Sequence, residues 1–298
     1  MRLLLLGGSG QVGQEFLSLD FPKNIEVVAP GRGDLDLTDE RALAGIIAAG
    51  AWNAVVNAAG YTNVDRAETE QAFAFAVNAT GPARLAAETG RRGIPLIHIS
   101  TDYVFDGRKK APYIEQDETR PINAYGHSKL EGERAIRPLN SRHIILRTSW
   151  VYSPYGHNFV KTILRLAAER NRLSIVEDQR GCPTAARDVA RAIRDISLAC
   201  VSDLERAPYG VYHFTGEGDT NWFLFAKAIV EMASNHLARL PEIVPTRTID
   251  YPTPAVRPID TRLDCAAIVC SGFGIKLRPW REGLKETVTQ LLGTGGTR

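Results

Sequence analysis

Short apolar runs alternate with longer stretches of helical spacing over the first half of the chain. Strands buried on both faces of a sheet are continuously apolar, and such strands are predicted at Leu3–Leu6, Ile25–Ala29, Ala54–Ala58, Ile94–Ser100 and His143–Arg147. Helices are predicted between them at Gln11–Leu19, Arg41–Ala49, Ala72–Arg91 and Ala124–Ile136. This alternation of strand and helix predicts an α/β fold with a parallel, doubly wound sheet.

The pattern changes after about residue 150. Helices are predicted at Asn158–Arg170, Ala185–Cys200, Asn221–His236 and Arg281–Leu292, and brief strands at Leu173–Val176 and Val211–Phe214. A proline-rich stretch follows between Pro241 and Pro258. We therefore predict two regions, residues 1–150 and a smaller, mixed α/β region at 151–298 that caps the first. The boundary is soft, because chain segments can cross between the regions, and the tail Gly293–Arg298 is expected to fray.

A glycine turn follows the first predicted strand directly. Gly7, Gly10 and Gly13 have the spacing G-x-x-G-x-x-G, and the next helix begins with Gln11 and Val12. Glycine permits a tight turn and the close approach of a pyrophosphate, and the N–H groups of a helix N-terminus attract the anion. An ordinary strand–helix turn is the alternative. The position after an N-terminal strand favours a dinucleotide site in a Rossmann-type sheet.

The end of the second strand bears on the choice of dinucleotide. An NAD-specific site has an acidic residue there for the ribose 2′-hydroxyl, whereas this chain has Arg32, which suits a 2′-phosphate. We expect NADPH, with NADH as the alternative cofactor and a solvated arginine as the structural alternative. Asp36 and Leu37 are expected to contact the adenine. The third strand ends in small residues that let the backbone approach the cofactor: Ala58, Ala59 and Gly60.

A tyrosine and a lysine lie one helical turn apart at the start of the helix predicted at Ala124–Ile136. Tyr125 and Lys129 stand at i and i+4 and share a helix face. Ketone reduction needs a proton donor, and a nearby ammonium group is expected to lower the pKa of the phenol. Thr101, at a strand end, can donate a second hydrogen bond to the same carbonyl oxygen. The set predicts the acid–base centre of a carbonyl reductase, against the alternative of a surface Tyr–Lys pair.

Composition narrows the range of partners and locations that we expect for the protein. The formal net charge of +2 gives no reason to expect a nucleic-acid-binding face. The four cysteines form neither a C-x-x-C pair nor a zinc-type cluster, which fits reduced thiols. The apolar start of the chain ends at Gly7, too soon for a secretory signal, and no run reaches the roughly 18–20 residues that span a bilayer. We expect a cytoplasmic protein without nucleic-acid or membrane partners.

Several segments together resemble a known family. They run through nearly the whole chain: Gly7–Gly13, Val55–Glu68, Ser100–Phe105, Tyr125–Glu131, Arg147–Tyr152, Asn158–Thr162, Asp178–Thr184 and Tyr251–Pro258. The combination resembles the extended short-chain dehydrogenase/reductase superfamily and, within it, the dTDP-4-dehydrorhamnose reductases. The resemblance implies NADPH-dependent reduction of the C4 keto group of dTDP-4-dehydro-L-rhamnose to dTDP-L-rhamnose. It also implies that residues 151–298 bind this nucleotide sugar.

The resemblance further implies roles for individual residues. The catalytic triad would be Thr101, Tyr125 and Lys129. The residues that bridge cofactor and substrate would be Gly60, Tyr61 and Thr62. The sugar pocket would be lined by Asp102 and Trp150, and the nucleotide diphosphate would be held by Asn158 and Arg257. An indole suits the face of a sugar ring, and a guanidinium suits a phosphate. A core tryptophan and a surface arginine are the alternatives for Trp150 and Arg257.

Two other functions stay open from the sequence. A reductase or epimerase of a different nucleotide-linked ketosugar would share these motifs. Related epimerase-reductases use a cysteine for acid–base work, which draws attention to Cys182, although we interpret it as a small loop residue. A related group keeps the fold as a non-catalytic regulatory subunit of methionine adenosyltransferase, which the intact catalytic set disfavours. His98, inside an apolar strand, is interpreted as a core histidine rather than a ligand.

Metal binding is a point of departure from the family. Some of its members are dimers bridged by Mg²⁺ through three glutamates, and the matching positions here hold Glu15, Arg187 and Gln290. An arginine and an amide cannot replace two carboxylates around a hard cation. We therefore expect no metal, and the oligomeric state, including a homodimer, stays open.

Overall fold

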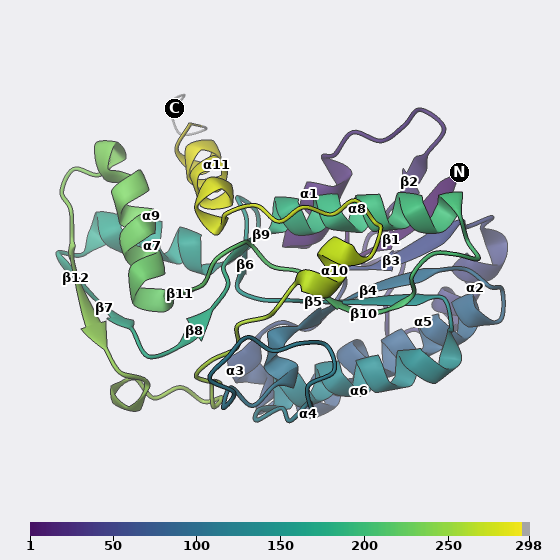
Figure 1. The fold of residues 1–298 in the computed structure, drawn as a ribbon, viewed down its shortest axis with the longest axis horizontal. Coiled ribbons are helices and arrows are strands. Elements are labelled where there is room, and N and C mark those ends of the chain that lie inside the picture. Colours follow the sequence, from purple (N-terminus) through teal and green to yellow (C-terminus); the bar gives the residue numbers. More distant parts are fainter. Residues whose placement is uncertain (294–298) are drawn as a thin grey trace.

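A six-stranded sheet forms the centre of the larger part of the molecule. The computed structural model describes residues 1–293, and its central strands are β1 (Arg2–Leu6), β2 (Glu26–Val28), β3 (Ala54–Asn57), β4 (Leu96–Thr101), β5 (His143–Thr148) and β10 (Gly210–His213) (Figure 1). The order is β10-β5-β4-β3-β1-β2, and all pairs are parallel. The chain reverses direction across the sheet at β1 and β3, the switch point where such folds bind ligands. The predicted doubly wound parallel sheet is confirmed.

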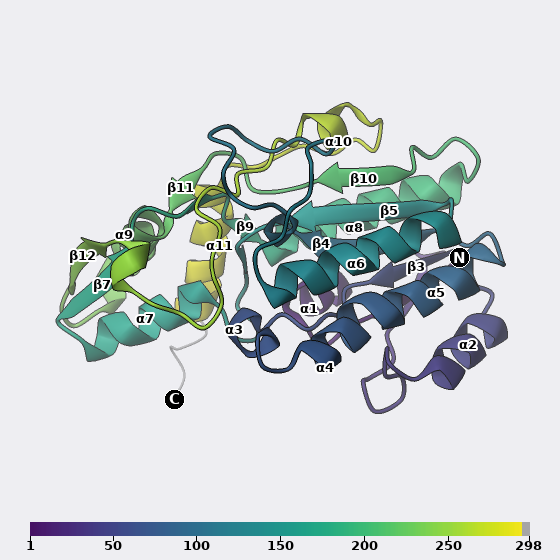
Figure 2. The same ribbon diagram turned by 90° about the horizontal axis from the view of Figure 1, so that it is seen from below.

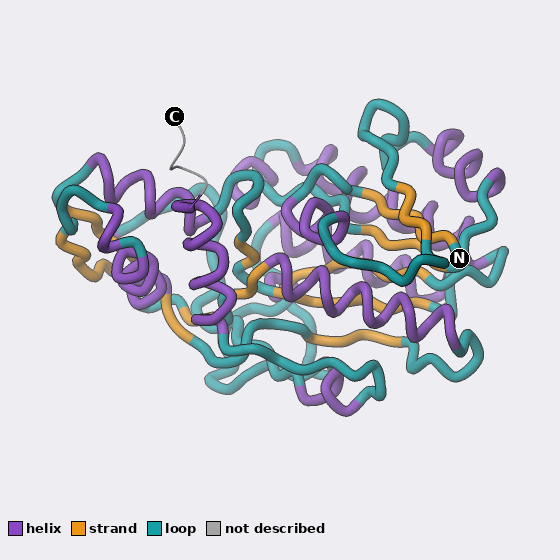
Figure 3. Tube along the Cα trace, turned by 90° about the horizontal axis from the view of Figure 1, so that it is seen from above, coloured by secondary structure: helices purple, strands orange, loops and turns teal. Residues whose placement is uncertain are grey.

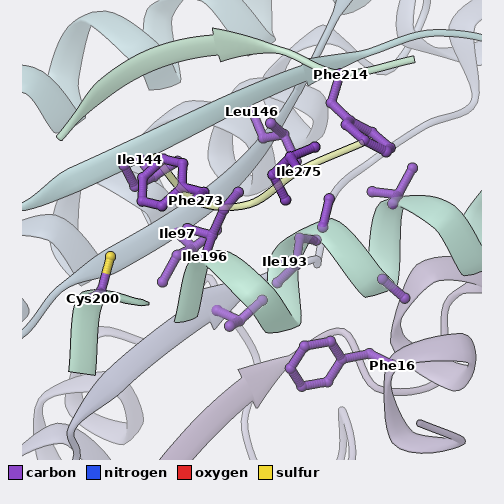
Figure 4. Packing of buried hydrophobic residues seen from close by; sticks show 14 of the residues in the cluster. Phe16, Ile97, Ile144, Leu146, Ile193, Ile196, Cys200, Phe214, Phe273 and Ile275 are labelled. Atoms are coloured by element: carbon purple, nitrogen blue, oxygen red, sulfur yellow. The ribbon is translucent and has the colours of Figure 1, made fainter. Parts of the chain in front are cut away.

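Helices cover both faces of this sheet. The helices on one face are α1 (Gln11–Leu17) and α8 (Ala186–Ser202), and those on the other are α2 (Glu40–Ala49), α5 (Gly81–Gly90) and α6 (Ala124–Leu139) (Figure 2). Successive side chains of a strand point to opposite faces. Leu3 and Leu5 of β1 therefore join the core under α1 and α8, and Leu4 and Leu6 join the core under α2 and α5. Figure 4 shows the first core, where Phe16 and Ile193 meet the sheet.

The helix expected at Ala72–Arg91 is interrupted in its middle. It consists of α4 (Gln71–Phe75), a π-helical segment at Ala76–Thr80, and α5. At this point α6 packs very close, since a Cβ on Gly132 would lie 2.1 Å from the carbonyl oxygen of Asn78. The wider π turn leaves Asn78 fully buried and facing α6.

The smaller part of the molecule lies at the end of the sheet part farther from the N-terminus (Figures 1 and 3). Its paired strands are β7 (Arg172–Val176) with β12 (Glu242–Thr246), β6 (Val151–Tyr152) with β9 (Thr184–Ala185), and β8 (Arg180–Gly181) with β11 (Thr220–Asn221). Its helices are α7 (Phe159–Glu169), α9 (Trp222–Met232) and α11 (Trp280–Gly293). They enclose a core built around Tyr152, Phe225 and Trp280. Short helices elsewhere are α3 (Val64–Ala67), α10 (Ala266–Cys270) and the 3₁₀ segments at Asp102–Val104, Ser234–His236 and Thr248–Asp250.

Segments from beyond residue 150 return to the sheet part. β10 pairs with β5 and forms the edge of the sheet, and α8 covers the face next to α1. The chain thus crosses the boundary that we placed at residue 150, and the division into 1–150 and 151–298 stays a prediction. Gly293 ends α11, and our expectation for the rest of the tail lies outside the described residues. Within residues 1–293, no helix has both the length and the apolar character needed to cross a bilayer.

Candidate active site

The glycine turn lies between β1 and α1 at the switch point of the sheet. Gly7 has a φ of +83°, and a Cβ there would lie 2.5 Å from the backbone nitrogen of Ala59. A Cβ on Gly13 would lie 2.1 Å from the carbonyl oxygen of Gly7. Neither position can therefore carry a side chain. Gly10 is the N-cap of α1 and makes no side-chain cap, so the first N–H groups of the helix face the turn unobstructed.

A pocket opens over this turn. Its lining includes most of the residues that we predicted to bind the cofactor: Gly7, Gly10, Arg32, Asp36, Leu37, Ala58, Ala59, Gly60 and Tyr61. Gln11, Val12 and Gly13 form the adjoining first turn of α1, and Thr62 follows the lining along the loop after β3. The pocket therefore joins the ends of the first three strands, as a dinucleotide site requires.

Arg32 stands exposed at the rim of the pocket. Its Nε lies 3.3 Å from Oδ2 of Asp36, and its guanidinium lies 5.9 Å from the ring centroid of Phe73. Asp36 also accepts hydrogen bonds from the backbone and the hydroxyl of Thr38, and these bonds lower the pKa of its carboxyl group. The guanidinium of Arg32 thus lies at the rim, and its partner Asp36 is already hydrogen-bonded to Thr38. This arrangement leaves Arg32 suited to bind a phosphate.

Tyr125 and Lys129 lie in the first turns of α6. Asn123 caps the helix, with Oδ1 accepting from the backbone nitrogen of Gly126 at 2.8 Å. A Cβ on Gly126 would lie 2.2 Å from the carbonyl oxygen of Tyr103, so this turn packs directly on the 3₁₀ segment after β4. The rings of Tyr125 and Tyr103 pack edge to face at 5.8 Å. The cap and this contact fix Tyr125 beside the end of β4, where Thr101 lies.

The phenol of Tyr125 is buried and holds its proton strongly. Burial raises its pKa, a hydrogen bond with Thr101 opposes the rise, and the charge of Asp102 adds to it. We expected a lowered pKa for Tyr125, and the structure gives a raised one, because burial dominates. Lys129 Nζ points at β4 and donates to the carbonyl of Ile99 at 2.7 Å.

Burial also shifts the pKa of Lys129. Its side chain is almost fully buried, and this lowers the pKa of the ammonium group to about 8, with the charge of Glu133 opposing the change. Its Nζ also lies 3.3 Å from Nε2 of His98, a fully buried histidine whose other ring nitrogen lies 3.0 Å from Asn57 Nδ2. The interpretation of His98 as a core histidine fits its burial, but the lysine contact connects it to the site.

Two further polar side chains, those of Thr101 and Asp102, lie beside Tyr125. Thr101 Oγ1 lies 3.0 Å from Oδ1 of Asp102 and accepts from the backbone nitrogen of Tyr103. Asp102 is 2% exposed, and its Oδ2 has no hydrogen-bond partner among the described residues. Burial raises the pKa of this carboxyl to about 7, and hydrogen bonds from nearby hydroxyls oppose the rise. A buried oxygen without a partner is expected at a surface that receives a ligand hydroxyl.

Trp150 follows β5 in a strained conformation. It is the one non-glycine residue among those described with a positive φ, +47°, and such strain concentrates at functional sites. Its ring stacks on Trp222 of α9, with centroids 3.6 Å apart and planes 9° apart. A Cβ on Gly181 would lie 2.5 Å from the same indole. Trp222 therefore belongs with Trp150, a partnership that no sequence spacing indicates.

Arg257 and Asn158 are engaged with protein groups. Arg257 Nη2 donates to Asp65 at 2.9 Å, and Nη1 lies 3.3 Å from the hydroxyl of Tyr103. Asn158 caps α7 through Oδ1, and its Nδ2 donates to Gln11 Oε1 at 2.9 Å. Arg257 thus lies next to Tyr103, whose ring packs on Tyr125. The amide of Asn158 joins the glycine-turn helix to the smaller part of the molecule.

Asn78 is a site residue that sequence reasoning missed. Its Oδ1 accepts from the backbone nitrogen of Tyr61, and its Nδ2 donates to the carbonyl of Tyr61 and to Ser128 Oγ, each at 2.9 Å. It therefore holds the pocket loop against α6. The residue faces inward because of the π turn, and a π turn leaves no signal in helical periodicity.

The positions compared with the magnesium-bridged dimers hold an ion pair. Glu15 is 2% exposed, and Arg187 Nη1 donates to its Oε2 at 3.2 Å. Burial raises the pKa of this carboxyl, and Arg187 opposes the rise. Within residues 1–293, His, Cys, Asp and Glu side chains form no group of three placed to hold a metal ion.

Cys182 lies buried at the end of β8. Burial raises the pKa of its thiol to about 11, which makes it a poor acid–base group near neutral pH. All four cysteines are free thiols. The environment of Cys182 agrees with our interpretation of a structural loop residue.

The parallel sheet, its glycine turn and the adjoining Tyr–Lys pair define a protein of the extended short-chain dehydrogenase/reductase class. The family model described as "RmlD substrate binding domain" matches residues 1–292, and the chain belongs to this family. A dTDP-4-dehydrorhamnose reductase of Sinorhizobium fredii is 42% identical over 99% of both chains, and that of Escherichia coli is 36% identical over 99% of both.

Solved structures agree with this assignment. A dTDP-4-dehydrorhamnose reductase of Bacillus anthracis, crystallised with NADP, has a TM-score of 0.90 at 32% identity, covering 97% of this chain and 99% of that one. A homologous reductase of Clostridium acetobutylicum has a TM-score of 0.89 at 36% identity, covering 98% and 99%. The UDP-glucose 4-epimerase of Thermotoga maritima, with 19% identity and a TM-score of 0.79, shares the fold.

Proposed function

We propose that the protein is an NADPH-dependent oxidoreductase that reduces the C4 keto group of dTDP-4-dehydro-L-rhamnose to give dTDP-L-rhamnose. Two contacts with residues that line the glycine-turn pocket support the proposal: Lys129 Nζ lies 4.0 Å from the position of a Cβ on Gly60, and Tyr61 packs against the apolar cluster that contains Tyr125. These contacts occur in a chain whose relatives, matched over their full length, are reductases of this sugar nucleotide.

The pocket fits a dinucleotide phosphate. A side chain at Gly7 or Gly13 would collide with backbone, and the turn ends in the unobstructed N-terminus of α1. Arg32 at the rim would hold a 2′-phosphate, which favours NADPH over NADH. The lining at Ala58–Tyr61 would lie along the cofactor toward Lys129. When bound, NADPH supplies the hydride for the ketone.

The raised pKa of Tyr125 suits the direction of reduction. The phenol is fully protonated at neutral pH, and the alkoxide that forms on hydride addition is the stronger base, so the proton passes from Tyr125 to that oxygen. Thr101 would donate a second hydrogen bond to it by exchanging its bond with Asp102 Oδ1. Lys129 lies one helical turn away, where its charge state acts on the phenol and on the adjacent cofactor ribose.

Substrate contacts follow from the neighbouring side chains. The unpartnered oxygen of Asp102 is suited to a sugar hydroxyl, and the indole of Trp150 to a sugar face. Arg257 would reach the diphosphate by exchanging its bond with Asp65. Asn158 already caps α7, so we propose that it holds α7 in place beside the substrate and does not bind the diphosphate through a free amide.

The setting of the protein is proposed on the same basis. Four free thiols support a cytoplasmic location. Its partners would be the nucleotide sugar and the dinucleotide, with no role in nucleic-acid or membrane binding, and a homodimer would be compatible with the chain.

Replacement of Tyr125 tests the proposal. Purified protein with NADPH and enzymatically generated dTDP-4-dehydro-L-rhamnose is expected to oxidise NADPH, and GDP-linked ketosugars are expected to be inactive. Tyr125→Phe is expected to lower kcat by roughly 100-fold or more. The matched control is Tyr209→Phe, which removes a hydroxyl bonded to the carbonyl of Leu204, remote from the site, and is expected to keep the wild-type rate.

Two results would contradict the proposal. Full activity of Tyr125→Phe would remove the phenol from the mechanism. A lack of NADPH oxidation with every ketosugar tested would favour a non-catalytic role instead.

A further inference from the structure

A chain of buried hydrogen bonds runs from the pocket loop to the catalytic lysine. It connects the backbone of Ala59, the side chains of Asn57 and His98, and Lys129 Nζ. Asn57 and His98 are fully buried, and Lys129 is nearly so. The consecutive distances are 3.1 Å, 3.0 Å and 3.3 Å, and Lys129 then donates to Ile99 at 2.7 Å.

The direction of each hydrogen bond follows from counting donors. The N–H of Ala59 can only donate, so the Asn57 atom that it meets is the oxygen, and Asn57 Nδ2 therefore faces His98. An amide nitrogen can only donate, which makes His98 Nδ1 the acceptor. A neutral imidazole has one donor and one acceptor, so Nε2 carries the hydrogen and points at Lys129 Nζ.

An uncharged lysine completes this chain and a charged one does not. A neutral amine has a lone pair that accepts from His98 Nε2–H while it donates to Ile99. A charged ammonium group has no acceptor, so the two donors would oppose each other. Reversing Asn57 only moves the conflict to the N–H of Ala59.

The charged groups near Lys129 do not offset the preference of the hydrogen-bond chain for an uncharged amine. Glu133, one turn farther along α6, is held by Arg147 at 2.9 Å and 2.7 Å and by Ser100 at 2.6 Å, and Arg137 lies 3.3 Å away. Its charge is thus largely compensated, although it still favours the ammonium form. Tyr125, on the preceding turn, is protonated. Burial, the largest cause, lowers the pKa of His98 and keeps the ring neutral.

We propose that His98 is a positioning residue for Lys129: held by Asn57 as the Nε2–H tautomer, it donates to the lysine amine and favours its uncharged form in the free enzyme. Asn57 and His98 thereby set the charge that the site presents to the phenol of Tyr125. The effect on catalysis rests on the proposed reductase function, whereas the hydrogen-bond chain itself does not.

Nitrogen NMR of the histidine ring tests the chain in the unmodified protein. In alkaline solution, the ¹⁵N shifts of His98, assigned by their loss in His98→Leu, are expected to show hydrogen on Nε2. Hydrogen on Nδ1 would overturn the proposal. This measurement requires neither cofactor nor substrate, so it stands or fails independently of the reaction.

Asn57→Asp is the variant that reverses the chain. A carboxylate accepts from both Ala59 and His98, so His98 is expected to move its hydrogen to Nδ1 and to accept from a charged Lys129. The pKa of Lys129, followed through its ¹³Cε resonance, is expected to rise by about one unit or more. The matched control is Asn53→Asp, an exposed change at the other end of β3, which is expected to leave the titration unchanged.

Rate measurements give the functional readout. The pH profile of kcat/KM reports groups of the free enzyme, so its lysine-dependent inflection is expected to move upward in Asn57→Asp. An unchanged His98 tautomer or an unchanged Lys129 titration in this variant would overturn the proposal. A moved titration with no activity toward the sugar nucleotide would instead contradict only the proposed function.

Discussion

Single residues in the site owe their chemistry to burial. Tyr125 and Asp102 hold protons more strongly than in water, and Lys129 holds its proton less strongly, because each is removed from solvent. Asp102 is nearly inaccessible, and within residues 1–293 one of its oxygens has no hydrogen-bond partner. The site therefore keeps groups whose burial costs stability, as expected where function dictates the residue.

The variant Asp102→Asn tests how much stability the buried carboxyl group costs, through the pH dependence of the free energy of unfolding. The folded pKa of about 7 lies above the unfolded value of 3.8, so the native state binds more protons between these values and its stability falls as pH rises through the window. The variant lacks this loss. Its stability relative to wild type is expected to increase from about pH 4 to 7, by a few kcal/mol at most, in urea unfolding. The exposed control Asp20→Asn should give a pH-independent difference, and a flat curve for Asp102→Asn would contradict the assignment.

Local spacing predicted only part of the site. Tyr125 and Lys129 are visible in the sequence because i and i+4 share a helix face whatever the tertiary structure. The link of His98 to Asn57 depends on the register of β3 with β4, which places these two residues opposite each other. The burial of Tyr125 and the direction of Lys129 Nζ depend on the same packing, which is why the sequence predicted a lowered pKa for Tyr125 where the structure gives a raised one.

At the scale of elements, the first crossover depends on the closeness of α1 to β1. Gly13→Ala would place a methyl group 2.1 Å from the carbonyl oxygen of Gly7, and the turn must open to accept it. The dissociation constant for NADPH is expected to rise roughly tenfold or more, about 1.4 kcal/mol, as measured by calorimetric titration.

The control for this change lies in α2. Gly45 is an exposed helix position, and no described atom outside its own stretch of helix lies within 4 Å of an added Cβ. Gly45→Ala is expected to stabilise the protein by about 0.5–1 kcal/mol without altering NADPH affinity. Equal NADPH affinity in both variants would show that the close turn is not what organises the pocket.

Elements with a strong apolar signal were predicted, and those shaped by their neighbours were not. The central strands follow continuous apolar runs, and β1 and β5 lie within a residue of their predicted ends. The strand β12 was missed because Pro245 and nearby prolines suggested irregular chain. It pairs with β7 alone, and an edge strand tolerates proline. The π turn at Ala76–Thr80 was missed because it follows from the packing of α6.

At the scale of the whole molecule, the two parts meet around the site. Gln11 of the sheet part accepts from Asn158 and Ser153 of the smaller part, and Arg257 reaches across to Asp65. The position of the side chains that we propose to bind the sugar nucleotide therefore depends on contacts between segments far apart in sequence, with separations from 142 to 192 residues.

Metal removal provides a test at this scale. Because Glu15 is paired with Arg187, its carboxylate is satisfied without a cation. Treatment with EDTA is expected to leave both the sedimentation coefficient and the rate of NADPH oxidation unchanged. A change in sedimentation that added Mg²⁺ reverses would show that this chain uses a bridging metal after all.

The return of β10 and α8 to the sheet part has a consequence for synthesis on the ribosome. Until β10 emerges, β5 is an open sheet edge, and until α8 emerges, only α1 covers the face that holds Leu3, Leu5 and Ile97. Nascent chains of this length expose both a strand edge and an apolar face, the two features that recruit chaperones or promote aggregation. The nucleotide-binding half is therefore encoded first but completed late, and a truncated gene that ends at its apparent boundary would yield an insoluble product.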